Sequence, residues 1–447
     1  MRISIIGTGY VGLVSGVCLA DRGNQVVCVD LDSAKVAMIQ QATAPIHEAG
    51  LPDLLARNCG TRLSATTDLR AAVLGSELTL IAVGTPYVGE RIDLTQIRSA
   101  ATAIGEALRD KPGYHVVVVK STVVPGTTRD VVLPLLEASS GKKAGVDFGV
   151  GMNPEFLREG NAVVDFLAPD RIVVGGIDER SQDEIAAMYA SFPTVDVLRT
   201  TTETAEMIKY AGNALLATLI SFSNEIGNLC ETVGIDVLDV MRGVHLDRRV
   251  VPILPDGARV RPGLVEYLAA GCGYGGSCFP KDIRALIAHG RSLGEPMHLL
   301  GAVAEINHRQ PSRVTDIVVR GLGLDGLAGL AGVQVAVLGL AFKPGTDDTR
   351  ESPALTVIDE LVSAGAVVRA FDPIARVEDP RMDQVATLED AVAGAAVVVV
   401  MTSWPEFLQL HTVLGAGDPP LVVDARRVLE PRNYPLYAGI GLGPDPR

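Results

Sequence analysis

The stretch Ile3-Ser4-Ile5-Ile6-Gly7-Thr8-Gly9-Tyr10-Val11-Gly12 decides the fold, because it joins a short apolar strand to a glycine-rich turn that opens a helix. Its glycines match the pattern G-x-G-x-x-G. Gly7 permits a tight turn, Gly9 lets backbone approach a pyrophosphate, and Gly12 permits close packing of the helix on the strand. Free N–H groups at the start of the helix attract an anion. The stretch therefore predicts a dinucleotide-binding turn.

Asp30 gives this prediction a second support. It ends the next apolar run, Val26–Val29, 18 residues after Gly12. A carboxylate there accepts hydrogen bonds from ribose hydroxyls and repels a 2′-phosphate. Lys35 is the nearest cation, and no arginine follows Asp30 directly. The sequence thus favours NAD over NADP, and a glycine turn with a solvated aspartate is the alternative interpretation.

Short apolar runs rich in β-branched residues recur through the first two hundred residues, each bounded by turn formers. Such runs are typical of strands buried on both faces of a parallel sheet with helices on either side. The expected strands are Ile3–Ile6, Val26–Val29, Leu78–Val83, Val116–Val119, Phe148–Gly151 and Ile172–Val174.

The pattern becomes mostly helical after about residue 200 and alternates again after Val333. One long helix is expected from about Glu203 to Val233, with threonines before it and Gly234 after it. The later run Val333–Leu338 is followed by Gly339, and Val367–Phe371 by Asp372, which repeats the opening arrangement. We therefore expect an α/β protein with two Rossmann-like domains joined by a central helical domain with one long helix. The expected bounds are 1–200, 201–310 and 311–447.

The totals restrict the class of protein. A chain of 447 residues is too long for one core of ordinary size, and a net charge of −14 argues against a nucleic-acid binder. No run approaches ~18 uninterrupted apolar residues, and the start does not resemble a signal peptide. The six cysteines form no C-x-x-C pair. These features predict a cytoplasmic, reduced protein without a membrane span or a structural metal.

The stretch Gly275-Gly276-Ser277-Cys278-Phe279-Pro280-Lys281-Asp282 carries the most chemistry. Pro280 suits the first turn of a helix, which places Cys278 just ahead of the helix N-terminus. The helix dipole, together with Lys281, stabilises a thiolate there. Asp282 lies about one turn further along, so a nucleophile and a carboxylate are close enough for covalent catalysis followed by attack of water. A small buried cysteine in a packed turn fits the local sequence equally well.

Two other groups are candidates for the same chemistry. Lys209 and Asn213 lie four residues apart on the long helix and can both donate hydrogen bonds to a developing oxyanion. Glu155 and Glu159 follow the strand Phe148–Gly151, at the carboxyl end where ligands bind in open α/β sheets. A solvated lysine and a plain surface acid pair are the alternatives.

Taken together, these motifs resemble the UDP-glucose/GDP-mannose dehydrogenase family, and most of all its UDP-glucose 6-dehydrogenase branch. The resemblance covers nearly the whole chain, in order. Its motifs are Gly7–Gly12, Val83–Pro86, Lys120–Val123, Asn153–Gly160, Pro169–Val173, Lys209–Asn213, Gly275–Asp282, Phe342-Lys343 and Asp348–Ser352.

The resemblance implies that the C6 alcohol of a nucleotide sugar is oxidised twice by NAD, through a thiohemiacetal and a thioester on Cys278. It implies that Lys209 and Asn213 stabilise the oxyanion, that Asp282 and Thr122 position or activate water, and that Glu155 assists proton transfer. Implied cofactor contacts are Gly7, Gly9, Tyr10, Val11, Gly12, Asp30, Lys35, Thr85, Thr122, Glu159, Lys281 and Arg350. Implied substrate contacts are Glu155, Phe156, Leu157, Arg158, Glu159, Lys209, Asn213, Arg249, Tyr267, Leu268, Ala269, Ala270, Gly271, Gly275 and Lys343. Arg249 matches an arginine that reaches the partner's substrate across a homodimer interface.

The chain also departs from the family's pattern. The loop between Arg249 and Tyr267 is about a dozen residues longer than usual, Cys272 stands where proline is common, and His47-Glu48-Ala49 replaces Tyr-Glu-Pro. The preferred reaction converts UDP-glucose to UDP-glucuronate. TDP-glucose, GDP-mannose and a UDP-N-acetylhexosamine stay open as substrates. A two-electron β-hydroxyacid dehydrogenase and a non-catalytic sensor of NAD or nucleotide sugar are further alternatives.

Overall fold

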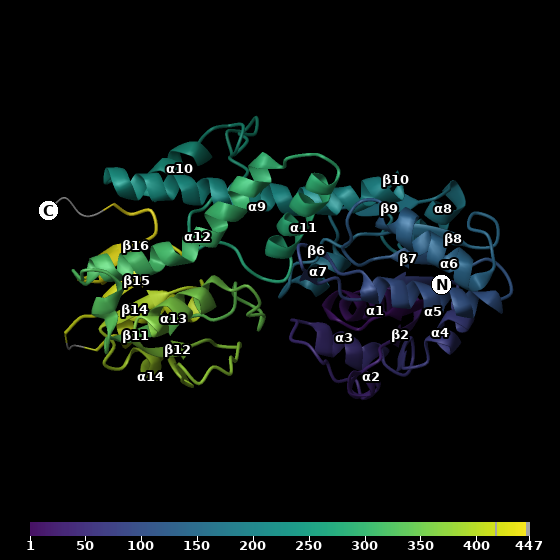
Figure 1. Ribbon diagram of the computed structural model, residues 1–447, viewed down its shortest axis with the longest axis horizontal. Coiled ribbons are helices and arrows are strands. Elements are labelled where there is room, and N and C mark those ends of the chain that lie inside the picture. Colours follow the sequence, from purple (N-terminus) through teal and green to yellow (C-terminus); the bar gives the residue numbers. More distant parts are fainter. Residues whose placement is uncertain (416–417, 444–447) are drawn as a thin grey trace. The chain divides into compact units, whose positions relative to one another are not determined.

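The computed structural model describes residues 1–415 and 418–443. It divides into two compact units, Met1–Gly212 and Asn213–Arg447, called the N-terminal and the C-terminal unit below. Figure 1 shows a sheet flanked by helices in each unit. Along the chain, the helices α9 to α12 come after the strands of the first sheet and before those of the second. The expected fold class, two Rossmann-like domains joined by a helical region, is confirmed.

The sheet of the N-terminal unit has the strand order β10-β9-β8-β7-β4-β1-β2-β3. Its strands are β1 (Arg2–Ile6), β2 (Gln25–Val29), β3 (Leu63–Thr66), β4 (Leu78–Ile81), β7 (Val116–Val119), β8 (Gly149–Met152), β9 (Ile172–Gly176) and β10 (Val197–Thr200). A small hairpin pairs β5 (Tyr87–Val88) with β6 (Arg91–Ile92).

One junction corrects the expectation of a purely parallel sheet, because β8 pairs with β9 antiparallel, with Gly151 opposite Gly176. An antiparallel neighbour begins at the edge where the preceding strand ends. The connection from residue 153 to residue 171 therefore starts and finishes at the same edge of the sheet. That edge is also the carboxyl end of β1, β4 and β7, so the segment with Glu155 and Glu159 is kept there.

Both faces of this sheet are buried, as the continuous apolar runs predict. In β7, Val116 and Val118 pack into the core on one face, and Val117 and Val119 into the core on the other. The covering helices are α1 (Tyr10–Asp21), α2 (Ser33–Gln40), α3 (Leu51–Asn58), α4 (Leu69–Gly75), α5 (Thr95–Arg109), α6 (Leu133–Ser140), α7 (Ala162–Leu167) and α8 (Glu179–Ala187), with a π-helix over Thr128–Val132.

The long helix α9 (Thr202–Val233) matches its expected extent, and the boundary between the units falls within it. The Thr201 hydroxyl accepts a hydrogen bond from Thr204 N, as expected of a threonine at a helix start. Three more helices follow it: α10 (Val237–His245), α11 (Phe279–Ser292) and α12 (His298–Gly321). The segment expected as a long loop contains a short 3-10 helix, Gly263–Tyr267.

The sheet of the C-terminal unit has the order β13-β12-β11-β14-β15-β16, and its pairs are parallel. The strands are β11 (Gln334–Leu338), β12 (Val367–Phe371), β13 (Asp383–Gln384), β14 (Val397–Val400), β15 (Leu421–Asp424) and β16 (Tyr437–Gly439). Helices α13 (Pro353–Ser363), α14 (Leu388–Val392) and α15 (Leu410–Val413) accompany them, with 3-10 helices over Leu327–Leu330, Pro405–Gln409 and Pro431–Asn433. Nowhere in residues 1–415 and 418–443 is a helix both long and apolar enough to cross a membrane.

Candidate active site

The glycine turn of the N-terminal unit leaves an open space in front of a helix start. Gly7 has φ of +98°, and a Cβ on it would lie 2.7 Å from the Ala82 carbonyl oxygen. A Cβ on Gly12 would overlap the Gly7 carbonyl oxygen, whereas a Cβ on Gly9 would meet nothing within 4 Å. Gly9 is the N-cap of α1. The turn therefore has room for a diphosphate at the N–H groups of α1, which fits NAD.

Asp30 lies half-buried at the end of β2, directly beside this turn. Its Oδ2 accepts hydrogen bonds from Thr8 N (2.8 Å) and Thr8 Oγ1 (2.5 Å), and its Oδ1 accepts one from Asp32 N (3.0 Å). Burial alone would raise the pKa of Asp30, but these three donors and the charge of Lys35 hold it below its usual value. The carboxylate is thus ionised and still partly accessible, as a ribose partner requires.

Tyr10 and Glu48 tie the glycine turn to the segment after β8. The Tyr10 hydroxyl donates to Glu48 Oε2 and accepts a hydrogen bond from Gly160 N at 2.9 Å. Glu48 also accepts from Gly160 N (2.7 Å) and Ala162 N (2.8 Å) and is buried. The hydroxyl of Tyr10 is therefore occupied within the protein. Glu48 was not among the predicted site residues; it keeps the glutamate of the family's Tyr-Glu-Pro and positions the end of the 153–160 segment.

The 153–160 segment brings Glu155 to the first turns of α9. Glu155 Oε1 forms an ion pair with Lys209 Nζ at 2.7 Å, and its Oε2 accepts a hydrogen bond from Leu157 N at 2.6 Å. Both side chains are about 5% exposed. Burial would raise the pKa of Glu155, but Lys209, Leu157 N and Lys120 together lower it. A buried carboxylate and ammonium in contact can exchange or share a proton with a bound ligand.

The other residues of this segment face different partners. Phe156 stacks under the Arg171 guanidinium at 4.0 Å, while Arg158 pairs with Asp165 at 2.7 Å. Glu159 is 9% exposed. The structure therefore places Glu155, Glu159 and Lys209 in buried surroundings, whereas the exposed side chain of Arg158 pairs with an acid of its own segment.

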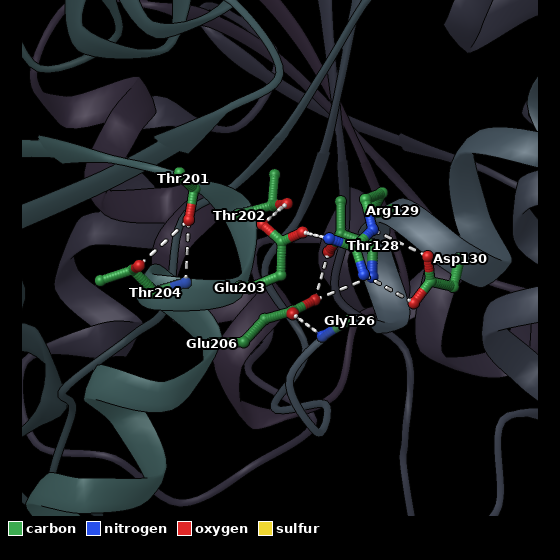
Figure 2. Close-up of polar contacts among 9 residues, drawn as sticks. All are labelled: Gly126, Thr128, Arg129, Asp130, Thr201, Thr202, Glu203, Thr204 and Glu206. Atoms are coloured by element: carbon green, nitrogen blue, oxygen red, sulfur yellow. Dashed lines mark hydrogen bonds and ion pairs between the residues drawn. The ribbon is translucent and has the colours of Figure 1, made fainter.

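The loop after β7 carries Thr122 and is fastened by a residue that the sequence analysis missed. The Thr122 carbonyl oxygen accepts a hydrogen bond from Thr85 Oγ1 at 2.8 Å. A few residues on, Glu206 of α9 accepts from Gly126 N (2.6 Å), Thr128 N (2.8 Å) and Thr128 Oγ1 (2.6 Å), as Figure 2 shows. An acid three residues before Lys209 on one helix was the available signal. Glu206 holds the loop against the helix that also carries Lys209.

The salt bridges around Glu206 lie further from the loop. Arg129 pairs with Glu203 and with Asp130, and the Thr202 hydroxyl donates to Glu203 at 2.9 Å (Figure 2). Glu206 itself is fully buried. Burial raises the pKa of Glu206 to about 7, although its three hydrogen-bond donors oppose that shift.

In the C-terminal unit, Cys278 is the N-cap of α11, with Pro280 in the first turn, as the sequence predicts. The side chain is half-buried, and Cys278 O accepts a hydrogen bond from Asp282 N at 2.9 Å. Asp282 is 2% exposed and binds two other candidates: Asn213 Nδ2 at 2.6 Å and Lys281 Nζ at 2.5 Å. The structure thus assembles Cys278, Asp282, Lys281 and Asn213 around one helix N-terminus, where the dipole favours a thiolate.

The glycines before Cys278 pack against the loop that follows β11. A Cβ on Gly275 would overlap the Glu351 carbonyl oxygen, and Gly276 N donates to Arg350 O at 2.9 Å. Gly275 is therefore needed for close packing. The Arg350 side chain is exposed and forms two hydrogen bonds of 2.8 Å with Asp348.

The remaining candidates of this unit lie on three loops. Gly271 N donates to Asn224 Oδ1 at 2.8 Å, and the Tyr267 ring lies 6.4 Å from that of Phe279. Lys343 Nζ lies 5.6 Å from the Phe342 ring. Arg249 is 86% exposed and pairs with Asp247 within its own loop.

Arg426 was not predicted, yet it joins the loop that carries Gly271 to the loop that carries Lys343. Its guanidinium donates to the carbonyl oxygens of Met401 (2.8 Å), Gly273 (3.3 Å) and Phe342 (3.1 Å). The side chain follows β15 at the carboxyl end of the parallel sheet, and that position was the signal that could have found it. Arg426 fixes the Gly273 loop relative to the Phe342 loop.

Three family models match consecutive parts of the chain. They describe the NAD binding domain (residues 1–193), the central domain (203–309) and the UDP binding domain (336–431) of the UDP-glucose/GDP-mannose dehydrogenase family.

Individual relatives agree with these matches. The UDP-glucose 6-dehydrogenase of Haloferax volcanii is 43% identical, over 97% of this chain and 98% of that protein. The GDP-mannose 6-dehydrogenase of Pseudomonas aeruginosa is 42% identical, over 83% and 81%. A solved UDP-glucose dehydrogenase from Pyrobaculum islandicum is 37% identical with a TM-score of 0.88, covering 98% of this chain and 97% of that one.

Proposed function

We infer that this chain, which belongs to the UDP-glucose/GDP-mannose dehydrogenase family, oxidises UDP-glucose at C6 to UDP-glucuronate. Membership of the family makes it an NAD-dependent oxidoreductase. The observation that carries the finer proposal is Cys278 at the N-terminus of α11, with Asp282, Asn213 and Lys281 hydrogen-bonded one turn further on. A simple alcohol dehydrogenase needs no nucleophile at that place, whereas a four-electron oxidation does.

In the proposed reaction, C6 of the sugar becomes covalently bound to the enzyme between the two oxidations. Loss of a hydride and a proton converts the C6 alcohol to an aldehyde, and Cys278 Sγ then bonds to C6 while the carbonyl oxygen takes up a proton. Loss of a second hydride and proton from this thiohemiacetal gives a thioester. Water adds to C6, the C6–S bond breaks, and the carboxylate leaves as the Cys278 thiol is restored. When bound, NAD accepts one hydride in each oxidation.

Each candidate residue has a proposed role in this sequence. Lys209 and Asn213 donate hydrogen bonds to the oxyanion, because an ammonium and an amide stabilise negative charge on an oxygen. Asp282 and Thr122 position or activate the attacking water, and Glu155 assists proton transfer during hydrolysis. Gly7, Gly9, Gly12 and Asp30 would hold NAD. The other proposed cofactor contacts are Tyr10, Val11, Lys35, Thr85, Thr122, Glu159, Lys281 and Arg350. The proposed substrate contacts are Glu155, Phe156, Leu157, Arg158, Glu159, Lys209, Asn213, Arg249, Tyr267, Leu268, Ala269, Ala270, Gly271, Gly275 and Lys343.

The test counts the NADH formed per nucleotide sugar consumed, over UDP-, TDP- and GDP-sugars and a UDP-N-acetylhexosamine. We expect about two NADH per sugar, with UDP-glucose the best substrate. Cys278→Ala should abolish formation of the acid. Cys59→Ala is the matched control, because Cys59 is also half-buried and its thiol donates to the backbone oxygens of Ile39 (3.1 Å) and Gln40 (3.4 Å). One NADH per sugar, or an active Cys278→Ala variant, would remove Cys278 from this role.

We further propose that the chain works in the cytoplasm as a homodimer, with domains over 1–200, 201–310 and 311–447. Leu215, Phe222 and Leu229 of α9 are each about half exposed, which is costly unless another chain covers them. Arg249 would then act on the partner's substrate.

Light scattering should give twice the chain mass, and Phe222→Glu with Leu229→Glu should give the monomer. A monomeric wild-type protein would overturn the dimer and leave the reaction untouched.

A further inference from the structure

A buried lysine, Lys120, lies near Glu155 and Lys209. It follows β7 directly and is 2% exposed. Its Nζ donates to Asn153 Oδ1 at 2.9 Å and lies 3.5 Å from Asn153 O and 3.4 Å from Tyr189 Oη. Tyr189 Oη donates to the same Asn153 Oδ1 at 2.6 Å. All these partners are neutral oxygen atoms, and no carboxylate in residues 1–415 and 418–443 forms an ion pair with the ammonium.

The cost of such a charge calls for a reason. Taking an ammonium out of water without an opposite charge in contact is strongly unfavourable, and an apolar side chain would fill the same space more cheaply. Burial lowers the pKa of Lys120 to about 8; nearby Glu155 opposes that shift, and nearby Lys209 adds to it. Lys120 is therefore close enough to interact electrostatically with both Glu155 and Lys209.

Lys111 shows what a purely structural buried lysine looks like in the same unit. It precedes β7, at the opposite end of the strand from Lys120. Its Nζ donates to the carbonyl oxygens of Val73 (2.8 Å), Leu74 (2.8 Å) and Ser76 (2.6 Å), at the C-terminus of α4. A cation at a helix C-terminus satisfies free carbonyls, and this explains Lys111 fully. The contacts of Lys120 Nζ, to Asn153 and the Tyr189 hydroxyl, are of another kind, since neither satisfies a carbonyl at a helix end.

We propose that Lys120 is a positioning residue for the reaction proposed above: with Asn153 and Tyr189 it holds the turn that leads to Glu155, and it adds a second positive charge near that carboxylate. Asn153 anchors the turn on both sides, since Asn153 N donates to Val119 O (2.9 Å) and its Nδ2 to Val173 O (2.8 Å). Glu155 is two residues further along. Moving Asn153 would therefore move Glu155.

The charges of two lysines decide the sign of the effect. Lys209 of α9 contacts Glu155, and Lys120 at the end of β7 acts on it from nearby. Tyr189, from the turn after α8, contacts Lys120 and Asn153, and Glu159 lies four residues further along the segment of Glu155. Glu206, one turn before Lys209, is bound to Gly126 and Thr128 instead. Both lysines favour the ionised form of Glu155. Removing the charge of Lys120 therefore raises the pH at which Glu155 becomes protonated, and activity that needs the carboxylate is lost at a higher pH.

The first arm of the test is kinetic. Lys120→Gln keeps a donor for Asn153 and removes the charge, Lys120→Met removes both, and Tyr189→Phe removes one hydrogen bond and keeps the charge. We expect the acid limb of the kcat–pH profile to move up by half to one pH unit in Lys120→Gln, with kcat reduced about tenfold and the KM for NAD within twofold. Tyr189→Phe should lower kcat less and leave the limb in place. Lys111→Met should lose stability and keep the wild-type profile.

The second arm needs no turnover and so separates this inference from the proposed function. It compares the thermal midpoints of Lys120→Gln, Glu155→Gln and the double variant. If the two charges support each other, the double variant loses fewer degrees than the sum of the single losses, whereas Lys111→Met with Glu155→Gln is additive. Absence of activity on every nucleotide sugar would refute the proposed function, but the thermal midpoints could still be measured and compared. Additive midpoints, or an unshifted pH profile in folded Lys120→Gln, would overturn the role of Lys120.

Discussion

Each unit contains a pair of parallel strands with a glycine after the first strand and an aspartate after the second. The two pairs share their backbone topology and differ in what the aspartate does. In the N-terminal unit, Gly7 N donates to Val29 O, and Asp30 follows β2. In the C-terminal unit, Gly339 N donates to Phe371 O, and Asp372 follows β12. Both hydrogen bonds measure 2.8 Å. The strands concerned are parallel neighbours in each case.

The acids have different surroundings. Asp30 is half-buried, next to a helix that begins at Tyr10. Asp372 is fully buried and accepts hydrogen bonds from Leu340 N, Ala341 N, Ile374 N, Ala375 N and Trp404 Nε1. After Gly339 the next α-helix begins only at Pro353. The second arrangement therefore keeps the Rossmann topology but uses its acid to hold loops together, with no capacity left for a ribose.

Asp372→Ala should have the largest effect on this comparison. It would leave five donors without their acceptor in a buried place, at a cost of about 4 kcal/mol or more in the free energy of unfolding. Urea unfolding measures this loss. NAD affinity of the folded fraction should stay at the wild-type value, since the dinucleotide turn lies in the other unit. A decrease of less than about 1 kcal/mol in the free energy of unfolding would show that the hydrogen bonds of Asp372 contribute little to stability.

Glu206→Gln extends the comparison to an acid of the N-terminal unit that is as buried as Asp372. Because the folded-state pKa of Glu206 is raised to about 7, the folded protein binds a proton that the unfolded chain has already lost above pH 4.5. Wild-type stability should therefore fall by about 2–3 kcal/mol as pH rises from 4.5 to 7. Glu206→Gln should lack this fall. Urea unfolding of both proteins across that pH range measures this difference. If the stability of the two proteins changed with pH in the same way, the prediction for Glu206 would be wrong.

Asp30→Asn should affect binding more than stability. The amide keeps the shape of the side chain but loses the charge and one acceptor for the ribose hydroxyls. NAD should bind about tenfold to a hundredfold more weakly, corresponding to about 1.4–2.8 kcal/mol. Titration calorimetry measures this change. Unaltered NAD affinity would place the ribose elsewhere and remove the functional difference between Asp30 and Asp372.

Thr8→Val should have the smallest effect. It removes the hydroxyl that donates to Asp30 at 2.5 Å and leaves Thr8 N as a donor. We expect a loss of about 1 kcal/mol in stability and a weaker change in NAD affinity than Asp30→Asn produces. The same calorimetric titration compares the two variants. A larger loss of affinity in Thr8→Val would mean that the hydroxyl, not the carboxylate, contacts the cofactor.

The parts of the fold that could be predicted are those coded by neighbouring residues. Gly7 to Gly12, the run Val116–Val119 and the extent of α9 each carry a local period or a turn requirement. The antiparallel junction between β8 and β9 was not predictable in this way, because strand direction depends on where the connecting segment packs. The strand β10 was missed as well, since its side chains at Val197, Leu198 and Arg199 are exposed and lack an apolar run.

The same distinction between local sequence and tertiary packing applies to the candidate site. Cys278 ahead of Pro280 follows from local sequence alone, because a proline in the first turn and a glycine-rich approach specify a helix start. The choice of partners does not, since Lys209 and Asn213 share one helix yet bind Glu155 and Asp282, 54 and 69 residues away in sequence. Nothing in the sequence spacing distinguishes these two acids from other carboxylates.

The sequence by itself determined the glycine turn with its acid, the duplicated strand–glycine–strand–acid order, the long helix and the cysteine at a helix start. Each depends on steric and hydrogen-bonding requirements within a few residues. Only the tertiary structure decided that Asp30 stays accessible while the hydrogen-bonding capacity of Asp372 is used up. It also decided that Lys120 and Glu206 bind loops of the N-terminal unit, and that Arg426 binds loops of the C-terminal unit. Burial and hydrogen-bond partners depend on segments far apart in the chain, because the free energy of a buried charge is set by everything that surrounds it.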